Sequence, residues 1–200
     1  MSVLKTAKLL TLNVGKSIGV LHALRRSDWR KQQLLILAYH GVSIDDEHIW
    51  DSDLFLSPDQ FRSRMQALKD YGCHVLPLAE GLQRLWNRTL PTCSVVLTFD
   101  DGSSDFYSRA FPILQEFGWP ATIYLTSYYA NYNRPVFDVM CSYLLWKASG
   151  KVVNVTGLIT GYSSFDLRTT ESREAAATAI REFSRHEKFS ARQKDELLNA

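Results

Sequence analysis

The stretch Val95–Gly102, with the sequence VVLTFDDG, decides the fold class of this chain. Its first five residues are apolar or β-branched, which is typical of a strand buried inside a sheet. Two adjacent acidic residues and a glycine follow at once, and a helical pattern runs from about residue 104 to residue 117. In parallel α/β folds, catalytic residues gather in the loops that follow the strands. The stretch therefore predicts an α/β protein with Asp100 and Asp101 at the carboxyl end of a central strand.

Strands and helices alternate on both sides of this stretch. A run that begins Ser57-Pro58 and has Gln60 at the third helical position predicts a capping box and a helix start. Strands that alternate with helices imply parallel pairing. We expect strands at 34–38, 74–77, 95–99 and 121–126, helices from 57, at 78–88, 104–117 and 138–148, a hairpin within 150–168, and a helical segment over 170–200 that is interrupted near 189–190.

Composition excludes several classes of protein. The net charge is +2, so we expect no nucleic-acid partner. The three cysteines are an odd number without a Cys-x-x-Cys spacing, so neither a disulfide framework nor a cysteine zinc site is expected. Residues 1–32 differ from the rest, because they carry seven Lys or Arg and one Asp. We interpret this segment as a basic amphipathic N-terminal helix or arm, followed by one domain over 33–200. Two interpretations of this helix stay open, contact with an anionic membrane surface and packing on the domain.

The acidic pair and one histidine are the candidate site residues. Asp100 and Asp101 follow the central strand, and His40 follows the strand at 34–38. Parallel strands place their carboxyl ends together, so His40 is expected near Asp100. The dipeptide alone is also compatible with capping the next helix. His40 alone is compatible with substrate contact, with proton relay, or with a structural hydrogen bond.

Four segments together resemble the polysaccharide deacetylase family. This family is also called the NodB homology domain and is similar to carbohydrate esterase family 4. The resemblance covers about residues 34–126 well and 127–200 loosely. It implies an irregular (β/α) barrel that is incomplete in this chain. The segments are Leu37–Val42 (LAYHGV), Val96–Gly102 (VLTFDDG), Phe111–Leu114 (FPIL) and Pro120–Leu125 (PATIYL).

The resemblance also implies an activity, which is the metal-dependent removal of N-acetyl groups from amino sugars of a polysaccharide or lipid-linked glycan. By position, Asp100 would be the catalytic general base, Asp101 a metal ligand, and His40 a substrate-binding residue. The implied cofactor is a divalent metal ion, usually zinc. The implied substrate is an N-acetylated amino-sugar glycan, which points to a protein outside the cytoplasm or on a membrane. No clear secretory signal precedes the domain, since Lys5, Lys8 and Lys16 interrupt the apolar run.

One part of the family pattern is missing. The family completes its metal site with two histidines three or four residues apart, whereas His186 is the one histidine after Asp101. We therefore expect this chain to be an N-terminal portion of a longer deacetylase, and a poor catalyst alone. The alternative is an inactive carbohydrate-binding or membrane-associated domain, with sugar stacking on aromatic side chains. A haloacid-dehalogenase-type phosphotransferase is disfavoured, because it needs two Asp separated by one residue. The aromatic candidates are Trp50, Trp119, Tyr128, Tyr129 and Tyr132.

Overall fold

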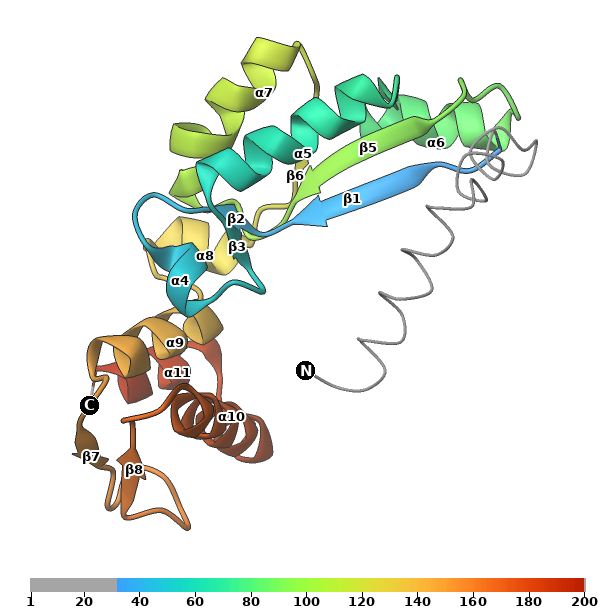
Figure 1. The fold of residues 1–200 in the computed structure, drawn as a ribbon. Helices are drawn as coiled ribbons and strands as arrows, with labels where there is room; N and C mark the ends of the chain where they lie inside the picture. The colour runs from blue at the N-terminus through green and yellow to red at the C-terminus, as the bar shows by residue number, and fades with distance from the viewer. Residues whose placement is uncertain (1–31, 200) are drawn as a thin grey trace.

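A parallel four-stranded sheet with β5 at its centre organises the structure, a computed structural model that describes residues 32–199 (Figure 1). β1 (Leu35–Tyr39) pairs with β5 (Ser94–Phe99) in parallel over its whole length, from Leu35↔Val95 to Tyr39↔Phe99. β4 (His74–Val75) and β6 (Thr122–Ile123) also pair in parallel with β5, at its start and its end respectively. The predicted α/β class with parallel pairing is therefore confirmed.

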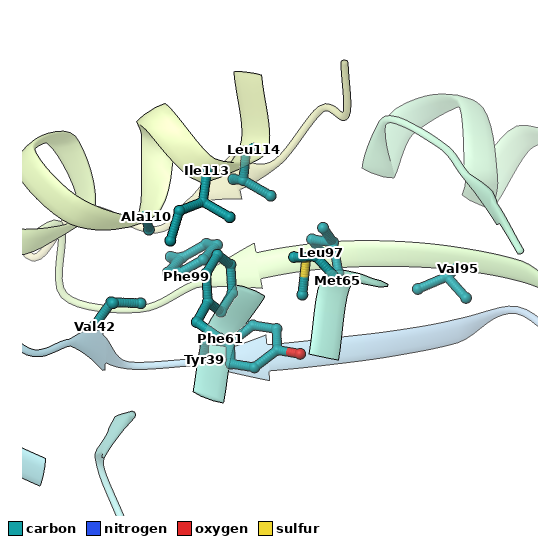
Figure 2. Packing of buried hydrophobic residues seen from close by; sticks show 10 residues of the cluster. All are labelled: Tyr39, Val42, Phe61, Met65, Val95, Leu97, Phe99, Ala110, Ile113 and Leu114. Carbon is teal, nitrogen blue, oxygen red and sulfur yellow. The ribbon is translucent and has the colours of Figure 1, made fainter. Parts of the chain in front are cut away.

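Helices cover both faces of β5. Alternate residues of the strand, including Leu97 and Phe99, pack against α5 (Pro58–Asp70) and α7 (Phe111–Phe117). Figure 2 shows this cluster between the strands and the helices. On the other face, α6 (Leu78–Trp86) approaches closely through Gly81, where a Cβ would meet a Val96 methyl at 2.9 Å. Every residue of β5 is buried, as its apolar sequence predicted.

A second group of elements lies beyond the carboxyl ends of β1 and β5 (Figure 1). α8 (Ser127–Tyr132) and α9 (Phe137–Lys147) lead to an antiparallel hairpin of β7 (Val152–Asn154) and β8 (Ser164–Asp166). α10 (Thr170–His186) and α11 (Ala191–Leu198) follow, and α10 packs on α9. The predicted hairpin and the break between the last two helices are confirmed. A separate apolar cluster holds this group together, formed by Val155, Ile159, Phe165, Leu167, Ala176 and Ala179.

A short excursion separates β1 from α5. It contains β2 (Gly41–Val42), α4 (Glu47–Trp50) and β3 (Phe55–Leu56), and β2 pairs with β3 in parallel. α5 then begins with the predicted capping box, in which Ser57 and Gln60 exchange side chain to backbone hydrogen bonds. The excursion matters for the site because it places α4 against α9.

Several expectations need correction. The continuous apolar run at 34–38 predicts a strand that is covered on both faces. In the structure Leu35 and Ile36 are 41% and 46% exposed, because β1 is the edge strand of this sheet. The helix predicted over 104–117 begins as a π-helix, η1 (Phe106–Ala110). Pro112 lacks an N–H and crowds the carbonyl four residues earlier, which accounts for the altered hydrogen bonding before α7. The sheet of the described residues is open, so the expected barrel is not confirmed.

The N-terminal amphipathic helix predicted for residues 1–32 falls almost entirely outside the described residues. It stays a prediction, as does the boundary between 32 and 33. Across residues 32–199, no helix is long and apolar enough to cross a membrane.

Two matched substitutions test the role of β5 as the centre of the core. Leu97 is fully buried, whereas Leu35 on the neighbouring strand is 41% exposed. Leu97→Ala is expected to lower the free energy of unfolding by about 2–5 kcal/mol, since it opens a cavity in packed surroundings. Leu35→Ala is expected to cost under about 1 kcal/mol. Urea unfolding followed by circular dichroism measures both, and equal costs would contradict this account of the core.

Candidate active site at the carboxyl ends of β1 and β5

The register between β1 and β5 brings His40 and Asp100 together. Tyr39 and Phe99 are register partners, and the next residue of each strand is a site candidate. The Asp100 N–H donates to the Tyr39 carbonyl at 2.9 Å, which extends the ladder to the acidic pair. Nε2 of His40 then lies 3.8 Å from Oδ2 of Asp100, and both side chains are partly exposed. A protonated His40 can therefore form an ion pair with Asp100, and both groups remain accessible to a ligand.

A tight turn separates the two neighbouring carboxylates. Asp101 and Gly102 both have a φ of +67°, in the left-handed region, and the Gly102 N–H donates to the Asp100 carbonyl at 2.9 Å. Such a φ is uncommon for a residue with a side chain. A Cβ on Gly102 would also lie 2.4 Å from a Leu125 methyl, so the turn needs glycine there. The turn directs Asp101 away from Asp100, and its Oδ1 accepts a hydrogen bond from the Thr126 hydroxyl at 3.3 Å.

A cavity of about 290 Å³ opens beside the turn. Its charged and polar lining residues are His40, Glu47, Asp101, Ser103 and Asp105. The rest of its lining is apolar and comes largely from α4, β3, α9 and the residues just before α9. Asp100 does not line the cavity, but its neighbour His40, 3.8 Å away, does. The apolar wall residues include Leu54, Phe55, Pro135, Val136, Val139 and Met140.

Asp105 is a site residue that the sequence analysis missed. It is 5% exposed, and its Oδ2 accepts a hydrogen bond from the Val42 N–H at 2.7 Å. Its Oδ1 accepts from the Ser103 hydroxyl. A Cβ on Gly41 would lie 2.8 Å from the same carboxylate, so glycine permits the close approach. Asp105 therefore ties the segment after His40 to the segment after Asp101. An acidic residue just ahead of a helix was the available signal, but it resembles an ordinary helix cap.

The residues present do not complete a catalytic zinc site. Across residues 32–199, no group of three or more His, Cys, Asp or Glu side chains is arranged to hold a metal ion. A catalytic zinc takes three protein ligands. Asp105, which also lines the cavity, is already engaged by the Val42 N–H and Ser103. His186 lies at the far end of α10 and contacts the neighbouring Glu187. The roles predicted for Asp100, Asp101 and His40 stay predictions.

A second cavity, of about 480 Å³, adjoins the first through Trp50, which lines both. It lies between α4, α9 and α10, and carboxylates, guanidinium groups and hydroxyls surround it. Burial raises the pKa of Asp51 in its wall above the ordinary value, an effect that the neighbouring Arg181 guanidinium opposes. The Trp50 ring stacks with Trp146 at 6.2 Å between centroids. Of the other aromatic candidates, Trp119 packs on the apolar core instead.

Comparison with known proteins identifies the class. Residues 87–184, which include Asp100, Asp101 and Asp105, match the model of the polysaccharide deacetylase family. The chain is 32% identical over 99 residues to the poly-β-1,6-N-acetyl-D-glucosamine N-deacetylase of Escherichia coli K12, and 30% identical over 112 residues to the enzyme of that name from Staphylococcus epidermidis. About half of the chain is therefore similar to the polysaccharide deacetylase family.

The matches are partial on both sides. The two alignments cover 49% and 50% of this chain, but 14% of the Escherichia coli protein and 38% of the Staphylococcus epidermidis protein. Among solved structures, the Streptococcus pyogenes deacetylase PplD in complex with acetate is 31% identical, with a TM-score of 0.46. That match covers 54% of this chain and 50% of PplD. The chain thus spans half or less of the length of these relatives.

Removal of the Asp105 carboxylate tests its positioning role. Asp105→Ala leaves the buried Val42 N–H without its partner, which is expected to lower the free energy of unfolding by about 1–3 kcal/mol. Asp45→Ala, at an exposed carboxylate in the same excursion as β2, is the control and is expected to change it by under about 0.5 kcal/mol. Urea unfolding measures both variants. An Asp105→Ala protein as stable as wild type would show that this contact does not hold the site together.

Proposed function

We propose that this chain forms part of a metal-dependent hydrolase that removes N-acetyl groups from amino sugars of a polysaccharide or lipid-linked glycan. The observation that carries the proposal is the placement of Asp100 within 3.8 Å of His40, with Asp101 lining the cavity beside them. The acidic pair lies inside the segment that matches the family model. Curated relatives at 30–32% identity are named as N-deacetylases of an N-acetyl-D-glucosamine polymer.

Asp100 is proposed as the general base. De-N-acetylation needs a water molecule to lose a proton as it attacks the acetamide carbonyl, and a positioned carboxylate accepts that proton. Asp100 is partly exposed, so water can reach it. His40 lies 3.8 Å from Asp100 and lines the cavity, and it is proposed to contact the substrate.

Asp101 is proposed as a metal ligand. A divalent metal ion, with zinc the first candidate, would polarise the acetamide carbonyl in such a site. Across residues 32–199, no group of three or more His, Cys, Asp or Glu side chains is arranged to hold a metal ion, so Asp101 would need further ligands beside it. The metal dependence of the reaction is therefore part of the proposal, and the steps assigned to this chain rest on Asp100 and His40.

The shape and chemistry of the first cavity support an N-acetylated sugar as the substrate. An acetamide group has an apolar methyl on one side of a polar carbonyl and N–H. The cavity likewise joins an apolar wall, which includes Val139 and Met140, to a polar side with Asp101 and Ser103. Ligand sites commonly combine apolar surroundings with a few polar groups that set the orientation. The acetyl methyl would lie against α9 and the sugar hydroxyls toward the solvent.

The second cavity supports a polymeric substrate. It shares Trp50 with the first, so a ligand of more than one sugar unit can occupy both. Its wall includes Asp51, Asp53, Glu174 and Arg173, whose side chains suit the hydroxyl groups of a sugar. Because such a polymer lies outside the cytoplasm or at a membrane, we propose the same location for the protein. Residues 1–32 are the segment proposed to contact an anionic membrane surface.

Substitution of the proposed base tests the activity in the full-length protein. Asp100→Asn is expected to lower acetate release from an N-acetylglucosamine oligosaccharide at least about 100-fold, because the amide cannot accept the proton. Binding of the oligosaccharide is expected to persist. Asp45→Asn, at an exposed carboxylate that does not line the cavity, serves as the control. Full activity in Asp100→Asn would refute its role, and wild-type protein that binds the sugar without releasing acetate would favour an inactive binding domain.

A pair of substitutions on α10 tests the polymeric substrate. Glu174 and Glu182 are both exposed on this helix, but only Glu174 lines the second cavity. Glu174→Ala is expected to weaken binding of a long oligosaccharide about tenfold, which corresponds to the loss of one hydrogen bond to a charged group. Binding of the single sugar is expected to be unchanged, as is binding of either ligand by Glu182→Ala. Calorimetry measures the affinities, and an unchanged affinity of Glu174→Ala for the long ligand would contradict this arrangement.

A further inference from the structure

Two of the three cysteines meet at the end of the sheet opposite the site. Cys73 precedes β4 and Cys93 precedes β5, and the two strands pair in parallel through His74↔Ser94. The His74 N–H donates to the Cys93 carbonyl at 3.1 Å, so the strand ladder continues between these positions. The two Sγ atoms lie 2.8 Å apart. A spacing of twenty residues between two cysteines matches no sequence motif. The two sulfurs come together because β4 and β5 pair.

The backbone holds both cysteines in place. Cys73 follows Gly72, whose φ of +63° ends α5, and the Cys73 N–H donates to the Leu68 carbonyl at 3.0 Å. Cys93 has a φ of +60°, which is uncommon for a residue other than glycine. A disulfide needs its two Cβ atoms to point toward one another, and sulfurs that are already in contact meet that condition with little backbone movement.

We propose that Cys73 and Cys93 form an intramolecular disulfide when the protein meets an oxidising disulfide, such as that of a thiol–disulfide oxidoreductase or oxidised glutathione. Cys73 is half-buried and Cys93 is buried, so the Cys73 thiolate attacks the oxidant first. One thiolate of the oxidant leaves, and a mixed disulfide forms at Cys73. The Cys93 thiolate then attacks Cys73 and releases the second thiolate of the oxidant. The protein loses two electrons and two protons, and the oxidant is reduced to two thiols.

The bond would join the start of β4 to the start of β5. It would close a loop that contains β4 and α6, and loop closure of this kind restricts the unfolded chain. Asp100 lies at the opposite end of β5, so the bond would strengthen the central strand without touching the site. Disulfides of this kind persist in oxidising compartments. The proposal is independent of the proposed deacetylase activity.

The third cysteine provides a matched control. Cys141 is 2% exposed on α9, and burial raises the pKa of its thiol to about 11. Cys141 lies on α9, whereas Cys73 and Cys93 precede the paired strands β4 and β5. It is therefore expected to stay a thiol under the conditions that oxidise the other two.

The test equilibrates the full chain with oxidised glutathione, unfolds it, alkylates the remaining thiols with iodoacetamide and measures the intact mass. The expected result is one alkylated cysteine before reduction and three after it, with a Cys73–Cys93 linked peptide in the digest. Cys141→Ala is expected to keep the link, whereas Cys73→Ser is expected to lose it. Three alkylated cysteines after oxidation, stable glutathione adducts, or links that involve Cys141 would overturn the proposal.

The midpoint of urea unfolding gives a second test. It compares the oxidised and reduced forms of the wild-type protein, so it does not require the variants to fold. The oxidised wild-type protein is expected to unfold at a higher urea concentration than the same protein after reduction. In Cys141→Ala the shift is expected to remain. An unchanged midpoint in wild-type protein that carries the bond would contradict its stabilising role.

Discussion

The parallel pairing of β1 with β5 is the constraint on which the rest of the structure depends. Its ladder runs from Leu35↔Val95 to Tyr39↔Phe99 and continues to the hydrogen bond from the Asp100 N–H to the Tyr39 carbonyl. A shift of one residue would turn the buried side chains of β5 to the other face and would separate His40 from Asp100. The same register therefore supports the core and the site. The geometry of the candidate site and the packing of the core therefore cannot be changed independently.

Asp105 and the turn at Asp101–Gly102 convert that register into a shaped site. The turn separates the adjacent carboxylates, so that Asp100 lies by His40 and Asp101 by Thr126. Asp105 then fastens β2 to the start of the following helix through the buried Val42 N–H. Two segments that are more than sixty residues apart along the chain are joined by this one carboxylate. Such buried, fully bonded carboxylates hold loops in position more strictly than exposed ion pairs do.

The helices beyond the sheet extend the site rather than form an unrelated unit. α9 supplies the apolar wall of the first cavity, and α10 forms much of the second, which adjoins the first through Trp50. The match to the polysaccharide deacetylase family reaches residue 184 and so includes both helices. Across residues 32–199, no group of three or more His, Cys, Asp or Glu side chains is arranged to hold a metal ion, so the metal stays part of the proposal.

Local chemistry made much of this protein predictable from its sequence. The apolar run of β5, the Ser57 capping box and the VLTFDDG motif depend on neighbouring residues, so the α/β class, the start of α5 and the family followed from them. Contacts between distant segments decided the rest. The exposure of β1, the bond from Val42 to Asp105, the second cavity and the approach of Cys73 to Cys93 each join residues that no spacing rule connects. Such contacts arise only when the strands pair and the helices pack, because burial and distance are properties of the folded chain.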